Sequence, residues 1–432
     1  MNTSTKKGKG LGEYMPLAFA AGIGSMLGSG IIVGLSATIV VWQEGLGLDT
    51  TQVGLLSGIL TFAIAFGSLF GGRLADKIGR VLFFNWINLF YAIGAAICVF
   101  APNFTVLLIG LIIAGLASGA DLPVSMTIVS HDAPDEATAA QLVSTTQVFW
   151  QVGVFISFIC AFLVSAMQGA TGGRVVFAIL AVFAVIAWLW RLLSPTFRRF
   201  HEAADVRDAA RPAVVGNGKV SVTKVLFGAD KKVLLTYFLA IVIFYVGWNL
   251  LANTWGQFQT YMFSKAGAAQ SLATGLGIIL NFVTLVLNIV FASIAGGKYR
   301  NKAFFAGIVI SLIAMAAMAM GGANLWVIVG ATAFMNLGSP LAGEALYKVW
   351  TQESFPIEIR ASIQGFTNGF SRLCCGLFAL ITPALVLPET IQTTMWCFFG
   401  IVIIEGIAGT IMIRAQKKYG TDEERQAHKI AA

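Results

Sequence analysis

Five ionisable residues interrupt long apolar stretches of this sequence, and they are the first candidates for chemistry. They are Asp121, Glu344, Lys348, Arg372 and Glu405. A charged side chain in an apolar environment is costly, and such groups mark proton relays, ion pairs or substrate contacts. Glu344 and Lys348 lie four residues apart, so they share one helix face. This set therefore predicts proton transfer or charge pairing within an apolar protein.

Two interpretations are open for Asp121 and Glu344, which occupy nearly equivalent places in two similar segments. Each is a proton-coupling residue, since burial favours the protonated form of a carboxyl, or each belongs to an ion pair that stabilises one conformation. Arg372 either contacts an anionic or polyhydroxylated substrate or pairs with one of these carboxylates. We expect Glu405 to be close enough to the inner end of its apolar stretch to extend towards water.

Amide and aromatic side chains within the apolar stretches are the candidates for binding a hydrophilic ligand. An amide both donates and accepts hydrogen bonds, and binding sites combine a few such groups with aromatic walls. Buried amides equally hold helices together, and that alternative stays open. The predicted substrate-binding residues are Gln147, Trp150, Gln151, Trp248, Asn249, Asn253, Asn281 and Arg372.

The composition excludes several classes of protein. Apolar residues make up 57% of the chain, charged residues 11%, and the mean hydropathy is +0.81. Average soluble proteins are about 25% charged, so a disordered chain, a nucleic-acid module and an ordinary cytosolic enzyme are excluded. The five Cys and three His show no metal-ligand spacing and no nucleophile–base pattern. We predict no catalytic residue, no metal, no cofactor and no nucleic-acid partner.

About twelve apolar stretches have the length of roughly 20 residues that a helix needs to cross a bilayer. They lie at 17–42, 51–71, 81–101, 105–129, 139–167, 173–193, 234–262, 270–295, 303–322, 325–350, 359–387 and 391–414. If all of them span, most of the 28 Lys and Arg residues lie on one side, which the positive-inside rule makes cytoplasmic together with both termini. The fold predicted is an all-α membrane protein with twelve transmembrane helices.

Two motifs occur once in each half of the chain. Residues 71–80 (GGRLADKIGR) correspond to residues 296–302, and residues 132–139 correspond to residues 353–361. Such repeats are typical of secondary transporters, with the substrate site between the halves near the midplane. The predicted organisation is a six-helix bundle (1–193), a cytoplasmic linker (194–233), a second six-helix bundle (234–414) and a cytoplasmic tail (415–432).

The run at residues 71–80 resembles the signature loop of the major facilitator superfamily. Residues 115–123 and 353–360 resemble the sugar porters and the metabolite–proton symporters within it. Gln147 and Asn249 match sugar-contacting positions of the sugar porters, and Asn281 matches a polar position of their eighth helix. The resemblance also implies charges that hold the transporter closed on the cytoplasmic side, with orientation by positive charge as the alternative. The gating residues so implied are Gly72, Asp76, Arg80, Glu353 and Arg360.

The sequence also departs from the sugar porters. The first stretch lacks their carboxylate, Leu111 stands where they carry Arg, and Lys348 stands where they carry Trp. We predict an importer of a sugar, polyol, glycoside or sugar acid, driven by proton symport. A uniporter of the same solutes, drug or metabolite efflux by proton antiport, and a non-transporting sensor are the alternatives. The predicted setting is a monomer in the plasma (bacterial inner) membrane, whose partners are the solute, protons and lipid.

Overall fold

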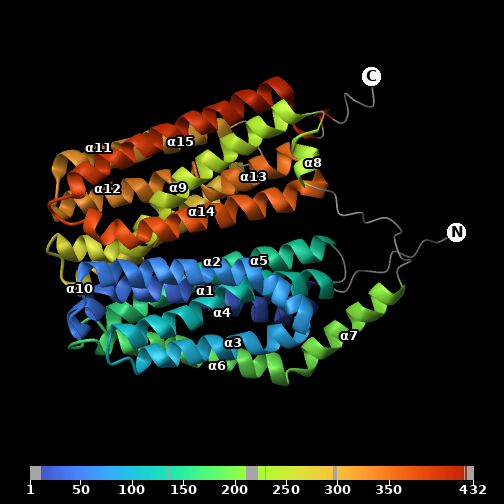
Figure 1. Cartoon of the computed structure of the whole chain (residues 1–432), viewed down its shortest axis with the longest axis horizontal. Coiled ribbons are helices and arrows are strands. Elements are labelled where there is room, and N and C mark those ends of the chain that lie inside the picture. The colour runs from blue at the N-terminus through green and yellow to red at the C-terminus, as the bar shows by residue number, and fades with distance from the viewer. Residues whose placement is uncertain are drawn as a thin grey trace. The chain divides into compact units, whose positions relative to one another are not determined.

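The computed structural model describes residues 11–133, 136–210, 222–228, 230–294, 299–422 and 424–425, and within these ranges every regular element is a helix. The chain divides into two compact units (Figure 1). Unit 1 comprises Met1–Leu48 and Ile59–Val214, and unit 2 comprises Asp49–Gly58 and Val215–Ala432. The predicted domain bounds stay a prediction, and the two units differ from them in that Asp49–Gly58 groups with unit 2.

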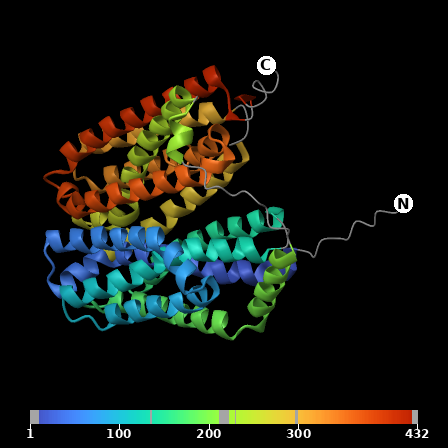
Figure 2. The ribbon, with the colours of Figure 1, turned by 45° about the vertical axis from the view of Figure 1, so that its right-hand side comes forward.

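Helices α1 to α7 make up unit 1, apart from the first turns of α2, which group with unit 2. They are α1 (Leu11–Leu46), α2 (Thr50–Ile78), α3 (Arg80–Val99), α4 (Phe104–Asp132), α5 (Glu136–Leu163), α6 (Thr171–Leu193) and α7 (Pro195–Ala210). Unit 2 contains α8 (Val222–Leu226), α9 (Lys231–Lys265), α10 (Gln270–Ile294), α11 (Arg300–Gly321), α12 (Leu325–Gly338), α13 (Glu344–Ser354), α14 (Ile357–Leu385) and α15 (Ile391–Tyr419). The pale green α9 and the red α15 lie side by side in both views (Figure 1, Figure 2).

Small residues let the helices of unit 1 approach closely, as expected where apolar surfaces alone give little specificity. Gly119 of α4 faces the backbone of Ile64 in α2, and any Cβ there would collide with it. Pro123 has no N–H to donate to the carbonyl of Gly119, one turn earlier. The hydroxyl of Ser68 in α2 donates to that carbonyl instead, at 2.9 Å. This contact fixes the position of α4, which carries Asp121.

The apolar stretch predicted at 325–350 is interrupted in the structure. Helix α12 ends at Gly338 and α13 begins at Glu344. Pro340 provides the reason, because it lacks the N–H that would continue the helix and its ring clashes with the carbonyl one turn earlier. The continuous span expected there is therefore wrong, and Glu344 lies in the first turn of a new helix rather than in mid-helix.

The start of the predicted linker is ordered as α7. Phe197 and Phe200 of α7 are buried, and Phe200 stacks on Tyr14 of α1 with ring centroids 4.9 Å apart. The imidazole Nδ1 of His201 lies against the carboxylate of Asp132 at the end of α4. Helix α7 therefore belongs to the packed core of unit 1, and the residues 211–221 that follow lie outside the described residues.

Ten helices among the described residues are long and apolar enough to cross a membrane. The segment Val148–Leu163 of α5 and the helix α12 are shorter apolar helices. The remaining predicted stretches each coincide with one helix, so their existence is confirmed. The count of twelve spans and the sides on which the connections lie stay predictions.

Candidate functional site

A polar cluster in unit 2 gathers most of the predicted site residues of that half. We call it the unit 2 cluster and define it as Tyr245, Trp248 and Asn249 of α9, Glu344, Tyr347 and Lys348 of α13, and Asn368, Ser371 and Arg372 of α14. Helices α13 and α14 both pack on α9, which brings the three sets of side chains together. The sequence placed these residues on separate spans, and the structure joins them.

Aromatic rings form one side of the unit 2 cluster. The ring of Tyr245 stacks on Trp248 at a centroid distance of 5.6 Å and lies 3.8 Å from the ring of Tyr347. The indole N–H of Trp248 donates to the hydroxyl of Ser339 at 2.9 Å, in the break between α12 and α13. A Cβ added at Gly343 would lie 2.5 Å from that indole nitrogen. The break therefore provides both the hydrogen-bond partner and the space for the indole.

Amide groups form a hydrogen-bonded row beside these rings. The side-chain amide of Asn249 donates to the Ser371 hydroxyl at 2.9 Å, and that hydroxyl donates to the Asn368 carbonyl at 2.9 Å. The Nε of Arg372 donates to the side-chain oxygen of Asn368 at 3.1 Å. Asn249 keeps its side-chain oxygen free of any described donor, so it is able to accept from a ligand.

The ionisable side chains of the unit 2 cluster carry one negative and two positive charges. The Lys348 ammonium lies 2.7 Å from the carboxylate of Glu344, and both side chains are partly exposed. Arg372 interacts electrostatically with Glu344 but lies beyond ion-pair distance of every carboxylate in the described part of unit 2. Glu344, one of the two partners considered for Arg372, pairs with Lys348 instead.

The other predicted polar residues of unit 2 make contacts within or between helices. The amide of Gln257 donates to the side-chain oxygen of Asn253 at 2.7 Å, one turn away. Asn281 donates to the carbonyl of Gly277 in its own helix at 2.9 Å. These contacts fit the alternative in which such amides stabilise the helices. Asn253 and Asn281 are partly exposed and keep further hydrogen-bonding capacity.

The predicted substrate residues of unit 1 lie on α5. Trp150 packs against α1, where a Cβ at Gly28 would lie 3.4 Å from its ring, and its carbonyl accepts from the Ser29 hydroxyl at 2.7 Å. Trp150 and Gln151 are both partly exposed. The side chain of Gln147 lies outside the described residues.

Asp121 forms a buried ion pair with Arg191 near the end of α6. The two nitrogens of the guanidinium lie 2.6 and 3.1 Å from the two carboxylate oxygens, which is a bidentate geometry. The side chains are 3% and 0% exposed. The hydroxyl of Ser125 donates to the same carboxylate at 2.9 Å. These contacts support the pairing interpretation of Asp121.

Arg191 also joins Asp121 to two other helices. Its guanidinium donates to the carbonyl of Ala20 in α1 at 2.7 Å and to that of Phe84 in α3 at 3.0 Å. It stacks on the Phe84 ring at 3.9 Å, and Gly24 of α1 leaves room for the carboxylate. Arg191 was not among the predicted site residues, although its place inside the predicted span 173–193 was a signal.

Glu353 and Arg360, two of the predicted gating residues, lie where α13 meets α14. The carboxylate of Glu353 accepts from Arg300 of α11 at 2.6 Å and from Gln416 of α15 at 3.2 Å. Arg360 donates to the carbonyl of Phe355 at 3.1 Å. Glu353 therefore connects three helices of unit 2, which is compatible with a gating contact.

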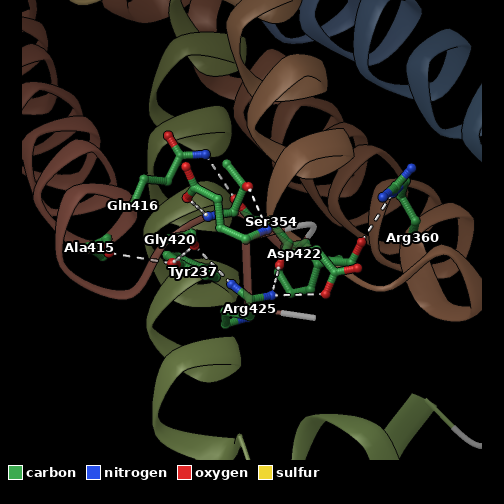
Figure 3. Close-up of polar contacts among 11 residues, drawn as sticks. Tyr237, Ser354, Arg360, Ala415, Gln416, Gly420, Asp422 and Arg425 are labelled. Atoms are coloured by element: carbon green, nitrogen blue, oxygen red, sulfur yellow. Dashed lines mark hydrogen bonds and ion pairs between the residues drawn. The ribbon is translucent and has the colours of Figure 1, made fainter. Parts of the chain in front are cut away.

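The segment that follows α15 packs onto the same end of unit 2 (Figure 3). Arg425 donates to the carbonyls of Ser354 and Gly420, at 2.7 and 3.0 Å. The hydroxyl of Tyr237 in α9 donates to Gly420 at 2.7 Å. Part of the predicted tail is thus an ordered extension of the bundle.

The predicted gating residues of unit 1 are less fully described. Gly72 is partly exposed, and a Cβ there would meet nothing within 4 Å. The preceding Gly71 is the glycine that packing requires, since its Cβ would lie 2.5 Å from that of Ala120. Arg80 begins α3 and is exposed. The side chain of Asp76 lies outside the described residues.

Glu405 does not extend towards water, so that expectation is wrong. It is 4% exposed, whereas its neighbours Ile403 and Ile404 are 42% and 55% exposed. A Cβ at Gly247 of α9 would lie 3.5 Å from the Cβ of Glu405. The side chain of Glu405 therefore points into unit 2. It faces the turn of α9 that contains Gly247, the residue before Trp248.

Comparison with known proteins adds three findings. The profile of the Major Facilitator Superfamily matches residues 17–379. The minor myo-inositol transporter IolF of Bacillus subtilis (strain 168) is 30% identical over 407 residues, which cover 91% of this chain and 89% of that protein. Probable polyol transporter 4 of Arabidopsis thaliana is 28% identical over 179 residues, which cover 41% of this chain and 33% of that protein.

The fold is also similar to a solved transporter structure. The inward-open xylose transporter XylE from E. coli superposes with a TM-score of 0.69 at 15% identity, over 91% of this chain and 94% of that one. At this identity the similarity concerns the fold alone.

Proposed function

The chain belongs to the major facilitator superfamily, and from this premise we propose that it imports a small polyhydroxylated solute by proton symport. The chain is accordingly an integral membrane transporter and not an enzyme. The resemblance inferred from residues 71–80 is confirmed, and the substrate class, the direction and the coupling are the proposed parts. Similarity to a myo-inositol transporter and to a polyol transporter supports the substrate class.

The observation that carries the proposal is the unit 2 cluster. Its stacked rings, Tyr245 and Trp248, stand beside the hydrogen-bonded row that begins at Asn249. A polyol presents hydroxyl groups to such amides and C–H faces to such rings, and its binding needs both kinds of surface. Drug efflux fits less well, because a pocket for apolar drugs has no need of a row of hydrogen-bonded amides such as Asn249 and Asn368.

A sugar acid is the second candidate substrate, and one observation favours it. Arg372 has no carboxylate within ion-pair distance in the described part of unit 2, while the neighbouring Lys348 is matched by Glu344. A charge that is partly withdrawn from water gains from a counter-charge. A carboxylate on the solute would supply it through a charge-assisted hydrogen bond.

We propose the plasma membrane, the inner membrane in a bacterium, as the location, with both termini in the cytoplasm. The placement of Lys and Arg residues supports this orientation. Gly72, Asp76, Arg80, Glu353 and Arg360 are proposed to act in gating, and the contact of Glu353 with Arg300 is the kind of pair that a conformational change would break.

Ligand-induced thermal stabilisation tests the substrate class. Purified protein is heated with myo-inositol, D-xylose, D-glucose, gluconate or glucuronate, since a ligand of the folded state raises the melting temperature. We expect neutral polyols to stabilise the wild type and Asn249→Ala to lose the effect. The exposed Asn301, at the start of α11, provides the control variant Asn301→Ala, which should keep it.

Each alternative gives its own result in this experiment. Stabilisation by the acids alone, lost in Arg372→Gln, would establish the sugar-acid substrate instead. No stabilisation by any polyol or acid, together with stabilisation by apolar drugs, would contradict the proposed function.

A further inference from the structure

A buried carboxyl without a cationic partner lies in α15 of unit 2. Glu405 is 4% exposed, and no Lys, Arg or His nitrogen of the described residues lies within ion-pair distance of it. Its inward direction is set by packing, since the flanking residues Ile403, Ile404 and Ile407 are the exposed ones. Gly247 provides the space on α9, and Gly406 packs against Ile308 of α11 on the adjacent side.

The helices that surround Glu405 offer it no charge. Helices α9 and α11 are the main neighbours of α15. Helix α9 carries no Asp, Glu, Lys or Arg between Lys232 and Lys265, and α11 carries none after Lys302. The titratable side chains of these stretches are Tyr237, Tyr245 and Tyr261, and on α15 itself Cys397 and Arg414 are the nearest in sequence.

The other two intramembrane carboxylates are already matched. Asp121 holds Arg191 in a bidentate pair, and Glu344 holds Lys348 at 2.7 Å. Each of these two carboxylates lies beside a cation, whereas Glu405 is 4% exposed and has no cation within ion-pair distance among the described residues.

We propose that Glu405 carries the proton that is coupled to solute transport. An isolated ionised carboxylate in an apolar interior is so unfavourable that the group takes up a proton instead. In the conformation described here Glu405 therefore holds a proton. A conformational change that admits water to the carboxyl stabilises the ion and releases the proton to that side.

The position of Glu405 provides the link to the solute. Its contact residue Gly247 directly precedes Trp248 and Asn249, the α9 residues of the unit 2 cluster. A movement of α9 on solute binding changes the packing around Glu405, and ionisation of Glu405 changes the packing of α9. Binding of the solute and of the proton are then linked reciprocally. This inference rests on the proposed function, because it assigns the coupling residue of the proposed symport.

Transport assays in proteoliposomes separate coupling from solute movement. The first assay measures exchange of labelled myo-inositol without a pH gradient, and the second measures accumulation driven by an acidic exterior. One proton per solute gives the wild type about tenfold accumulation per unit of pH difference. We expect Glu405→Gln, which imitates the protonated carboxyl, to keep exchange and to accumulate no solute above the external concentration. Glu405→Asp, which still titrates, should keep part of the accumulation.

The matched control is Glu389→Gln, which removes an exposed carboxyl ahead of the same helix and should accumulate solute as the wild type does. Accumulation by Glu405→Gln at the wild-type level would overturn the proposal. So would a wild type that exchanges solute but does not accumulate it when the exterior is acidic. If Glu405→Gln lacks exchange, infrared difference spectra of the wild type on solute addition decide the matter. The proposal is supported if the wild type shows a protonated-carboxyl band that changes on solute addition and if this band is missing or shifted in Glu405→Asp. The proposal is overturned if the wild type shows no such band. No exchange of any polyol by the wild type would instead refute the proposed function.

Discussion

Replacing Asp121 by asparagine should destabilise unit 1 strongly, because it removes the counter-charge of a guanidinium that is 0% exposed. Breaking one side of a buried ion pair costs about 3–5 kcal/mol. The hydrogen bonds of Arg191 to Ala20 and Phe84 remain, so the loss is confined to the pair. At about 2–4 °C per kcal/mol for a unit of this size, the melting temperature should fall by about 6–20 °C.

A double-mutant cycle tests this reasoning. Asp121→Asn, Arg191→Met and the double variant are heated in detergent with a thiol-reactive dye, which reports exposure of the buried Cys98. The two substitutions remove the same interaction, so the double variant should be more stable than the sum of the singles predicts, by about 1–3 kcal/mol. Strict additivity would refute the pairing.

An exposed pair in the same unit provides the control. Arg198 and Glu202 of α7 lie 2.9 Å apart with side chains 83% and 63% exposed, and Glu202→Gln should cost less than about 0.5 kcal/mol of folding stability.

The variant Asp121→Asn also separates the two interpretations of Asp121. If the carboxylate is a structural partner, Asp121→Asn lowers stability but keeps pH-driven accumulation. Normal stability with lost accumulation would instead make Asp121 the coupling residue.

Two further predictions concern unit 2. Gly343→Ala should weaken stabilisation by the solute, since its Cβ would displace the indole of Trp248 from the cluster; an unchanged ligand response in the melting assay would show that this ring position does not matter. Arg425→Ala should speed proteolysis after Gly420 in limited digestion, since it removes the bond to the Ser354 carbonyl, whereas equal digestion of the variant and the wild type would show that the segment is held by other contacts.

The sequence predicted the helices well because each is a long apolar run. Hydropathy and length suffice for this when a bilayer core sets the length. They failed at Pro340, where the apolar average runs continuously across a break between α12 and α13. The proline and Gly343 were visible, but their consequence depended on the Trp248 side chain of another helix, which occupies the break.

The candidate site was predicted in part. The polar residues of α9 and α14 were found because a polar side chain in an apolar run stands out. Their partners were not found. Carboxylate pairing, one of the two interpretations of Arg372, is not seen in the described part of unit 2, where Arg372 donates to Asn368. The partner of Asp121 is Arg191 near the end of α6, a residue that was not among the predicted site residues.

The two errors at Arg191 and Glu405 have one physical cause. A run of sequence gives the depth of a residue along its helix, which is near the end of the apolar run for Arg191 and just past the middle of the run for Glu405. The direction of a side chain around the helix normally follows from the contrast between polar and apolar faces. That contrast vanishes in a helix that is apolar on all sides, as α15 is around Glu405. Direction then depends on where neighbouring helices leave room or offer carbonyl groups, as Gly247 does for Glu405 and Ala20 and Phe84 do for Arg191. Charged residues in such helices consequently require a three-dimensional structure before they are assigned to the surface.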